Sequence, residues 1–175
     1  FNIIHIDEMS EDMGYDDVMN DLYCNCRSYR IIETCHNISF TPSNKKFHPD
    51  AYAFCTPYHL ETFDNTPTPI KQVIEFPIDK KETNRLGALT ELGLDATKSH
   101  VVNIGLWTRG KNQGEGLSIA RKLPNVQFHF VGNQAGNFKE YWEPLMKNVP
   151  DNVRVWGERN DTDRFLQAAD VFMFN

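Results

Sequence analysis

Two cations stand in a glycine-bearing segment near the middle of the chain. Residues 101–116 read VVNIGLWTRGKNQGEG, an apolar run that ends at Gly105 and is followed by Arg109, Gly110 and Lys111. Short apolar runs of this kind are typical of buried strands. A helix that starts after such a turn offers unpaired N–H groups and a partial positive charge, which favour an anion. We therefore expect a phosphate or diphosphate site here; the alternative is two solvated cations on an ordinary loop.

The next residues predict the helix that would complete this site. Asn112 is suited to cap a helix, and Glu115 follows at the spacing of a capping box. The helix is expected over 113–123. If it forms, its first N–H groups and the two cations would face the same anion.

The composition is that of an ordinary globular protein. The 175 residues are 40% hydrophobic and 24% charged, with a formal net charge of −6. This acidic balance disfavours nucleic acid or an anionic membrane as the main partner, so the cationic segment is a local feature. No apolar run reaches the ~18 residues of a membrane span, and no secretory signal opens the sequence. Strand-like segments at both ends lead us to expect a fragment of a longer protein.

The cysteines are interpreted as reduced thiols. Cys24 and Cys26 are too close for an easy disulfide, and Cys35 and Cys55 lie in apolar, strand-like runs. Free thiols indicate a cytoplasmic protein, with peripheral attachment to a membrane as a further option for the whole protein. A metal site made of Cys24, Cys26, Cys35 and His36 is an alternative. Its spacing matches no standard zinc pattern, and we expect no metal.

Strands and helices are predicted to alternate in two lobes, residues 1–80 and 81–175. In the first lobe the pattern predicts strands over 2–6, 29–34, 51–56 and 73–76, and helices over 15–26 and 57–63. In the second it predicts strands over 101–104, 126–131, 152–156 and 171–174. It also predicts helices over 82–92 and 113–123, a third helix that begins at Asn137 and kinks or ends at Pro144, and a fourth that is capped by Asp161 and runs to residue 169. Asn137 and Glu140 repeat the capping-box spacing. Such alternation predicts βαβ units, hence parallel sheets with helices on both faces.

Glycine-bearing turns follow three strands of the second lobe. They occupy residues 105–111, 132–133 and 157–159. Ligands of open parallel sheets bind at the carboxyl ends of the strands. We therefore expect these turns to form a ledge for a nucleotide.

The phosphate loop of nucleoside triphosphatases is a competing interpretation of the cationic turn. Gly105, Gly110 and Lys111 match its spacing, but Asn112 stands where a Ser or Thr hydroxyl should bind magnesium. The partner aspartate should end an apolar strand, and the best candidate, Asp7, lies in the other lobe. This interpretation is less favoured.

The order of several segments resembles the two-lobed (GT-B fold) glycosyltransferases, above all the retaining family known as glycosyltransferase family 4 or group 1. The segments are NIIHIDE, RIIETCHN, HPDAYAFCTPYHLETF and VIEFPID in the first lobe, and VNIGLWTRGKNQ, FHFVGN, NVRVWGERND and AADVFMFN in the second. They cover essentially the whole chain. The resemblance implies an α/β fold of two Rossmann-like parallel-sheet lobes, each incomplete here. Residues 1–80 would be the C-terminal part of the acceptor-side lobe, and residues 81–175 the N-terminal part of the nucleotide-sugar-binding lobe.

The resemblance also implies roles for particular residues. Lys111 matches a lysine that binds the donor diphosphate, and Arg109 would replace an arginine whose position Leu106 occupies. His36 matches a histidine that reaches the sugar; the alternative is a histidine that satisfies loop carbonyls. The catalytic candidates are His36, Arg109 and Lys111, and the donor-binding candidates are Gly105, Arg109, Lys111, Asn112, Gly132, Asn133, Gly157, Glu158 and Arg159. Structural roles are expected for His5 and Asp7, and packing for Trp107 and Trp142.

The implied function is transfer of a sugar from a nucleotide diphosphate sugar to an unknown acceptor, in carbohydrate biosynthesis. Retention at the sugar carbon is implied by the family. Lys111 and Arg109 would stabilise the charge that builds on the leaving diphosphate, so no cofactor or metal is expected. The family's paired glutamates would lie beyond Asn175. A non-catalytic, Rossmann-like nucleotide-binding module is the alternative from another class.

Overall fold

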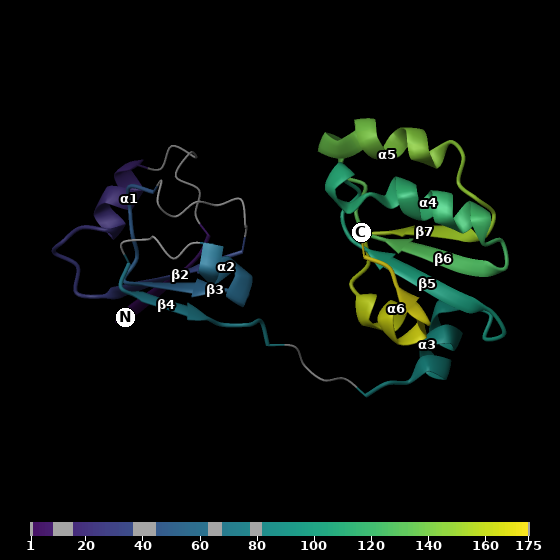
Figure 1. Cartoon of the computed structure of the whole chain (residues 1–175), viewed down its shortest axis with the longest axis horizontal. Coiled ribbons are helices and arrows are strands. Elements are labelled where there is room, and N and C mark those ends of the chain that lie inside the picture. The colour runs from purple at the N-terminus through teal and green to yellow at the C-terminus, as the bar shows by residue number, and fades with distance from the viewer. Residues whose placement is uncertain (1, 9–15, 37–44, 63–67, 78–81, 175) are drawn as a thin grey trace. The chain divides into compact units, whose positions relative to one another are not determined.

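The computed structural model describes residues 2–8, 16–36, 45–62, 68–77 and 82–174. The chain divides into two compact units, residues 1–80 and 81–175, which are described separately (Figure 1). Each unit contains a four-stranded sheet whose neighbouring strands are all parallel. The α/β class with two parallel sheets is therefore confirmed. No helix in the described ranges has the length and apolar character that a membrane span requires.

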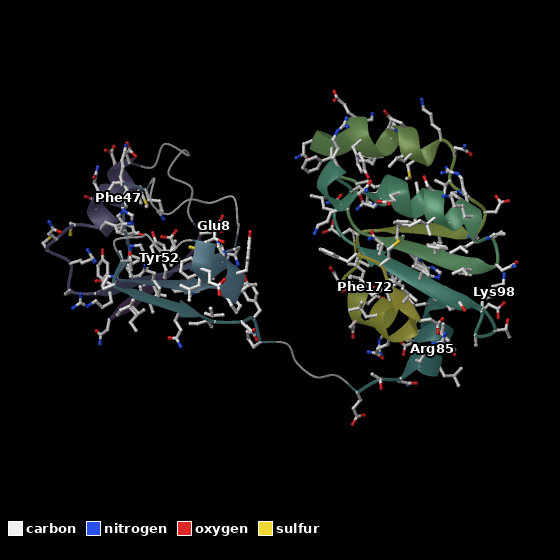
Figure 2. All side chains as sticks on the ribbon, viewed as in Figure 1. Glu8, Phe47, Tyr52, Arg85, Lys98 and Phe172 are labelled. Atoms are coloured by element: carbon white, nitrogen blue, oxygen red, sulfur yellow. The ribbon has the colours of Figure 1, made fainter. Side chains whose placement is uncertain are left out.

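The first unit is built on a sheet with strand order β1-β2-β3-β4. Its elements are β1 (Ile3–Asp7), α1 (Asp16–Leu22), β2 (Arg30–Cys35), β3 (Ala51–Phe54), α2 (Pro57–Thr62) and β4 (Ile70–Val73). The central strands β2 and β3 are mostly buried, as expected for parallel strands covered on both faces. Cys35, Tyr52 and Phe54 form the core with Leu60 of α2, and Figure 2 shows Tyr52 inside this unit.

A buried ion pair lies in this unit. The Lys45 Nζ is 2.5 Å and 2.6 Å from the two carboxylate oxygens of Glu33, a β2 residue with no exposed surface. A buried carboxylate is tolerated only when it is paired, so Lys45 compensates the charge that β2 brings into the interior. The predicted strand over 29–34 gave no indication of this pair.

Two elements of the first unit differ from their predictions. The predicted strand over 73–76 lies three residues earlier, because β3 ends at Phe54 and its last partner is Val73. Ile74 and Phe76 are left 55% and 60% exposed. The predicted helix over 15–26 ends at Leu22, whose carbonyl accepts a hydrogen bond from the Tyr29 hydroxyl at 2.7 Å. Within α1 Met19 is buried and Val18 is 58% exposed, and Tyr15 lies outside the described residues.

The second unit has the strand order β7-β6-β5-β8. Its strands are β5 (Ser99–Ile104), β6 (Val126–Val131), β7 (Val153–Gly157) and β8 (Val171–Phe172), and its α-helices are α3 (Arg85–Leu92), α4 (Gln113–Lys122), α5 (Lys139–Met146) and α6 (Thr162–Ala168). Two 3₁₀ turns precede α4 and α5, namely η3 (Arg109–Lys111) and η4 (Gly136–Phe138). Helices α4 and α5 lie on one side of the sheet and α3 and α6 on the other (Figure 1).

Both faces of this sheet are apolar, because the side chains of a strand alternate between its faces. Phe128 and Phe130 of β6 pack with α4, whereas Val131 packs with α3 and α6. The predicted capping box at Asn137 is wrong: Asn137 lies within η4, and α5 begins at Lys139 without a side-chain cap. Pro144 does not end α5, which continues to Met146.

A chain of buried hydrogen bonds crosses the β5–β7 part of the sheet. The Trp156 Nε1 donates to His129 Nδ1 at 3.2 Å, His129 Nε2 lies 3.0 Å from His100 Nδ1, and His100 Nε2 lies 2.9 Å from the Asp95 carbonyl oxygen. An indole N–H can only donate and a carbonyl can only accept. His129 is therefore unprotonated at Nδ1, and each histidine carries its proton on Nε2. The two rings are 1% and 2% exposed for His100 and His129.

Side chains distant in sequence close the unit. The Asn152 amide donates to the carbonyls of Ala120, Leu123 and Val126 at 2.8–3.0 Å, which ties the end of α4 to the start of β6. Arg85 of α3 binds both carboxylate oxygens of Asp170 at 2.9 Å. Asp170 also accepts a hydrogen bond from the His100 N–H at 2.8 Å. The first helix and the last strand of the unit are thereby joined to its central strand.

Candidate functional site

The carboxyl ends of β5, β6 and β7 meet in one network of backbone hydrogen bonds. The Gly105 N–H donates to the Val131 carbonyl at 2.9 Å, the Gly132 N–H to the Gly157 carbonyl at 2.7 Å, and the Trp107 N–H to the Asn133 carbonyl at 3.0 Å. The three turns that were expected to form a ledge are thus side by side.

Gly132 lies against the backbone of the neighbouring turn. Its φ is +152°, and a Cβ at this position would be 1.9 Å from the Gly105 carbonyl oxygen. Only glycine permits both this conformation and this approach. Gly157 has a φ of +71° and open space around it, so its requirement is conformational alone. Asn133 and Glu158 are exposed on the same turns.

Trp107 packs the cationic turn against the core of the second unit. Its side chain has no exposed surface and packs against Phe130 at 5.5 Å between ring centroids. The neighbouring Gln113 is also buried, and its Nε2 donates to the Leu106 carbonyl at 3.0 Å. The packing role predicted for Trp107 is confirmed. Trp142 also packs in this core and donates from Nε1 to the Ala135 carbonyl at 3.0 Å, as predicted.

The backbone of this turn is unlike a phosphate loop. Such a loop directs its N–H groups at the phosphates. Here the N–H groups of Gly105 and Trp107 bind the neighbouring turns, and those of Lys111 and Asn112 bind the Thr108 carbonyl at 3.1 Å and 3.2 Å. These donors are therefore satisfied within the chain, and the triphosphatase interpretation loses its main structural support.

The predicted capping box at Asn112 is wrong. Asn112 has a left-handed backbone, with φ +46°, and its side chain caps no backbone N–H. Its Nδ2 instead donates to the Glu115 carboxylate at 2.7 Å. The Gly114 N–H donates to the Tyr141 hydroxyl at 3.1 Å, and the Glu115 N–H to the Asn112 carbonyl at 3.1 Å. The start of α4 thus offers an anion fewer donors than expected.

The two cations of the turn remain, on η3. The Lys111 side chain runs beside Gly105 and places its Nζ 4.6 Å from the centre of the Phe174 ring. Arg109 is exposed and helps to line a cavity of about 260 Å³, together with Thr108, Gly110, Asn137, Phe138, Glu140 and Tyr141. Within the described ranges, neither cation forms an ion pair with a carboxylate. Both charges are therefore available to an anionic ligand.

Arg159, by contrast, is already engaged. Its Nε and Nη2 donate to the Asp161 carboxylate at 2.8 Å and 2.6 Å. This hydrogen bonding lowers the pKa of Asp161 and raises the pKa of Arg159. The predicted cap of α6 by Asp161 is wrong, because its carboxylate binds Arg159 and no N–H of the helix. Arg159 would need to exchange this partner to bind a donor.

The carboxyl ends of the strands in the first unit carry a second polar group of residues. The His36 N–H donates to Glu8 at 2.5 Å, its Nε2 is 3.4 Å from Asp7 and its Nδ1 is 3.5 Å from the Cys55 thiol. Its ring stacks on Phe76, with 5.1 Å between centroids and 3° between planes. Contacts within its own unit thus orient the His36 side chain, which stays exposed to solvent.

The sequence predicts His36 as a site residue but gives no indication of the residues that hold it. Glu8, Cys55 and Phe76 each lie just beyond a strand end, which is the only sequence signal they carry. Burial, Glu8 and Asp7 raise the pKa of Cys55, so this residue is a neutral thiol. Asp7 contacts His36 in addition to its place in the sheet, whereas His5 binds the Thr34 hydroxyl at 2.7 Å, a structural contact as expected.

The cysteine-based metal site has little support in this geometry. Cys24 and Cys26 lie together, with 2.7 Å between their sulfur atoms, but Cys35 is in the core. Burial raises the pKa of Cys35 to about 12, which disfavours the thiolate that a metal requires. In the part of the chain that the structure describes, no three His, Cys, Asp or Glu side chains are arranged to hold a metal.

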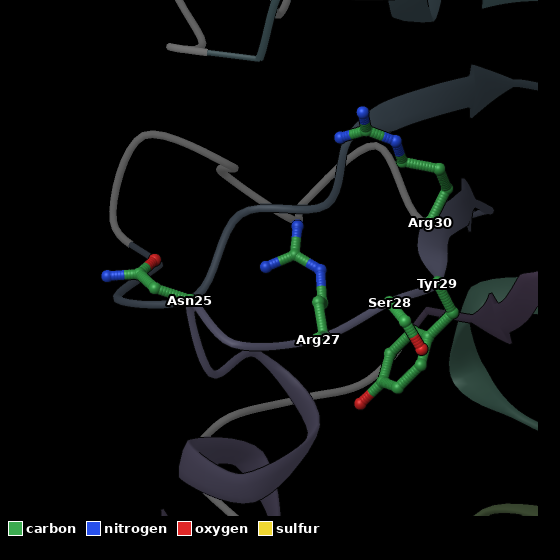
Figure 3. Close-up of a pocket in the computed structure, with 5 residues that line it drawn as sticks. All are labelled: Asn25, Arg27, Ser28, Tyr29 and Arg30. Carbon is green, nitrogen blue, oxygen red and sulfur yellow. The ribbon is translucent and has the colours of Figure 1, made fainter.

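A separate cavity of about 250 Å³ lies at the amino end of β2 (Figure 3), lined by Asn25, Arg27, Ser28, Tyr29 and Arg30. Both guanidinium groups bind the Asp50 carboxylate at 2.9 Å. Although partial burial opposes it, hydrogen bonds from the Ile31 N–H and the two arginines lower the pKa of Asp50 to about 2. Asp50 offsets one of the two positive charges of this cavity, and its contacts join the start of β2 to the residue before β3.

No protein-family model matches the sequence, and no curated protein matches it. Solved structures do match. Sucrose-phosphate synthase from Thermosynechococcus elongatus is 16% identical with a TM-score of 0.73, over 98% of this chain and 49% of that chain. HepE from Anabaena, in complex with UDP, is 14% identical with a TM-score of 0.72, over 98% and 52%. A glycosyltransferase from Rickettsia africae is 13% identical with a TM-score of 0.61, over 98% and 50%.

The fold is that of the GT-B glycosyltransferases. The chain spans about half the length of these structures. At such low identity the match establishes the fold alone, and the resemblance to family 4 stays a prediction.

Proposed function

We propose that the whole protein is a glycosyltransferase that moves a sugar from a nucleotide diphosphate sugar to an acceptor. The observation that carries this proposal is Lys111: a lysine with no carboxylate partner in the described ranges, set at the strand ends of a GT-B lobe beside Gly105. The fold supplies the context, since HepE was solved with UDP and with UDP-glucose. A uridine nucleotide is the first donor to test.

The chemistry asked of Lys111 is stabilisation of a leaving group. When the bond between the sugar carbon and the diphosphate oxygen breaks, the bonding electron pair leaves with the oxygen and negative charge grows on the diphosphate. The acceptor oxygen bonds to the carbon, and the proton of the acceptor hydroxyl passes to the departing diphosphate or to water. A fixed ammonium favours this charge more than it favours the intact donor, and it therefore lowers the barrier. One such group contributes on the order of 3 kcal/mol, roughly a hundredfold in rate.

Other residues have supporting roles in this proposal. Gly105 and Gly132 keep the turns low, so that the diphosphate can approach the backbone, and Asn133 and Glu158 are exposed where the nucleoside would lie. Arg109 would add a second charge from η3. In the first unit, the His36 ring would contact the sugar or the acceptor. We further propose retention at the sugar carbon and independence from metal, since lysine and arginine would take the place of a divalent cation.

The test is to incubate the whole protein with a panel of UDP-, GDP- and ADP-sugars and to measure turnover as release of the nucleoside diphosphate. Lys111→Ala should lower turnover about ten- to several-hundredfold, because a charge-assisted hydrogen bond contributes about 1.5–3 kcal/mol. Lys122→Ala, at the end of α4, is the matched control and should keep full activity. Turnover in excess chelator should be unchanged, and the anomeric configuration of the product by NMR reports retention.

Two results would contradict the proposal. Full activity of Lys111→Ala would show that the cationic turn is an ordinary connection. Nucleotide binding without release of any diphosphate, across the sugar panel and in the presence of acceptors, would favour the non-catalytic nucleotide-binding module.

A further inference from the structure

The contact between Lys111 and Phe174 leaves the lysine charge unneutralised. The Nζ lies 4.6 Å from the ring centroid. On its other side, the alkyl stem passes the Gly105 backbone, where an added Cβ would be 3.8 Å from the lysine Cγ and Cδ. The lysine is therefore held by a ring and a glycine. A carboxylate partner would have competed with a diphosphate for the ammonium, whereas a ring does not.

A ring face attracts an ammonium without neutralising it. Cation–π contacts act within about 6 Å of the centroid and are strongest when the group is partly desolvated. The ring takes one side of the ammonium, which leaves its other N–H donors directed elsewhere. Such a contact restricts a flexible side chain before a ligand arrives, and so reduces the entropy lost on binding.

The backbone in front of Phe174 is well fixed. The Met173 N–H donates to the Val102 carbonyl at 2.8 Å, and the Met173 carbonyl accepts from Asn103 Nδ2 at 2.9 Å. The Phe174 side chain itself is 68% exposed. Its ring pairs with that of Phe172 of β8, labelled in Figure 2, at 6.5 Å between centroids. The ordered backbone thus holds the Phe174 ring next to the Lys111 ammonium.

We propose that Phe174 is a positioning residue, which holds the Lys111 ammonium in place at the diphosphate site of the ligand-free protein. This inference rests on the proposed function, because it takes Lys111 to be a diphosphate ligand. Phe174 acts only through Lys111 and touches neither the donor nor the reacting atoms.

The first test observes Lys111 directly in the whole protein. Lysine side chains labelled with ¹³C-methyl groups give one signal for Lys111, identified by its loss in Lys111→Ala. The Phe174 ring current should displace this signal upfield. Phe174→Tyr should keep the displacement, and Phe174→Leu should abolish it. Tyr58→Leu is the control, since Tyr58 is a similarly exposed aromatic residue, at 66%, in the other unit.

The second test uses inorganic pyrophosphate as a probe that carries no base or sugar. Its affinity, measured by calorimetry, should fall about two- to fivefold in Phe174→Leu, the range expected for an exposed cation–π contact. Phe174→Tyr should bind as the wild type does. In the sugar-transfer assay, Phe174→Leu should affect kcat together with KM, because the fixed ammonium acts on the leaving group as well as on the bound donor.

The outcomes separate this inference from the proposed function. A displaced signal that returns in Phe174→Leu, with weaker pyrophosphate binding, supports it. If Lys111→Ala loses pyrophosphate but Phe174→Leu binds it equally or more tightly, Phe174 has no positioning role and Lys111 keeps its own. If Lys111→Ala binds pyrophosphate as tightly as the wild type, the diphosphate assignment itself is overturned, and this inference with it.

Discussion

Acid should destabilise the second unit through His129. Its Nδ1 accepts a hydrogen bond from the Trp156 N–H. A second proton on the ring would sit on Nδ1, and this N–H and the indole N–H would then face each other without an acceptor. Burial, above all, together with the neighbouring His100 and the positive charge of Arg154, lowers the pKa of His129 from 6.5 to about 4. Between these two pH values His129 binds a proton in the unfolded chain but not in the folded unit. The free energy of unfolding must therefore fall as the pH falls.

The magnitude follows from the pKa values. Each pH unit in this window changes the free energy of unfolding by about 1.4 kcal/mol, so the drop from pH 6.5 to about 4 approaches roughly 3 kcal/mol. Above pH 6.5 the histidine is neutral in both states and contributes no slope. The carboxylates with lowered pKa, including Asp95 and Asp170, titrate below their ordinary 3.8 and lie outside this window.

The assay is urea unfolding at a series of pH values, with tryptophan fluorescence as the signal that monitors unfolding. Trp107, Trp142 and Trp156 are all in the second unit, so this signal reports that unit alone. His129→Gln has no titrating ring and should lose most of the slope between pH 6.5 and 4.5. His5→Gln, in the first unit, should retain it. An equal slope in the wild type and in His129→Gln would refute the reasoning.

Further predictions concern backbone and amide contacts. Gly132→Ala should destabilise the second unit by at least about 3 kcal/mol, since its Cβ would meet the Gly105 carbonyl oxygen at 1.9 Å; Gly136→Ala, with nothing within 4 Å, is the control in thermal unfolding. A near-native melting temperature for Gly132→Ala would contradict the described contact. Asn152→Ala should reduce the free energy of unfolding in urea by about 1–3 kcal/mol, because buried carbonyls lose their donor, and Asn152→Asp by more, because a carboxylate donates no hydrogen bond. Equal stability of these two variants would argue against the amide's donor role.

The regular elements could be predicted where local pattern and burial agree. Strand β6 matches its predicted range of 126–131, because an apolar run between turn residues is buried on both faces. Strand β4 was misplaced because its bounds depend on the length of β3, a partner that lies elsewhere in the sequence. The failed caps have a similar origin. Asn112 and Asp161 found side-chain partners, Glu115 and Arg159, that compete with helix N–H groups.

The candidate site could be predicted only in part. Gly105, Gly132 and Lys111 are visible because glycine and lysine at strand ends have a local physical reason. The partners that orient the site, such as Phe174 for Lys111 or Cys55 for His36, come from strands whose adjacency no local pattern specifies. Residues of this kind are found only once the order of the strands in the sheet is known.

The joining of α3 to β8 has a consequence for how the protein is made. Arg85 and Asp170 are 85 residues apart in the chain, and α3 packs on α6. When α3 has left the ribosome, nearly the whole second unit must therefore still be synthesised before α6, on which this helix packs, is present. The strands of the first unit pair in chain order, so that unit can assemble while synthesis continues. The apolar face of α3 therefore stays uncovered over more of the synthesis of its unit than the strands of the first unit do.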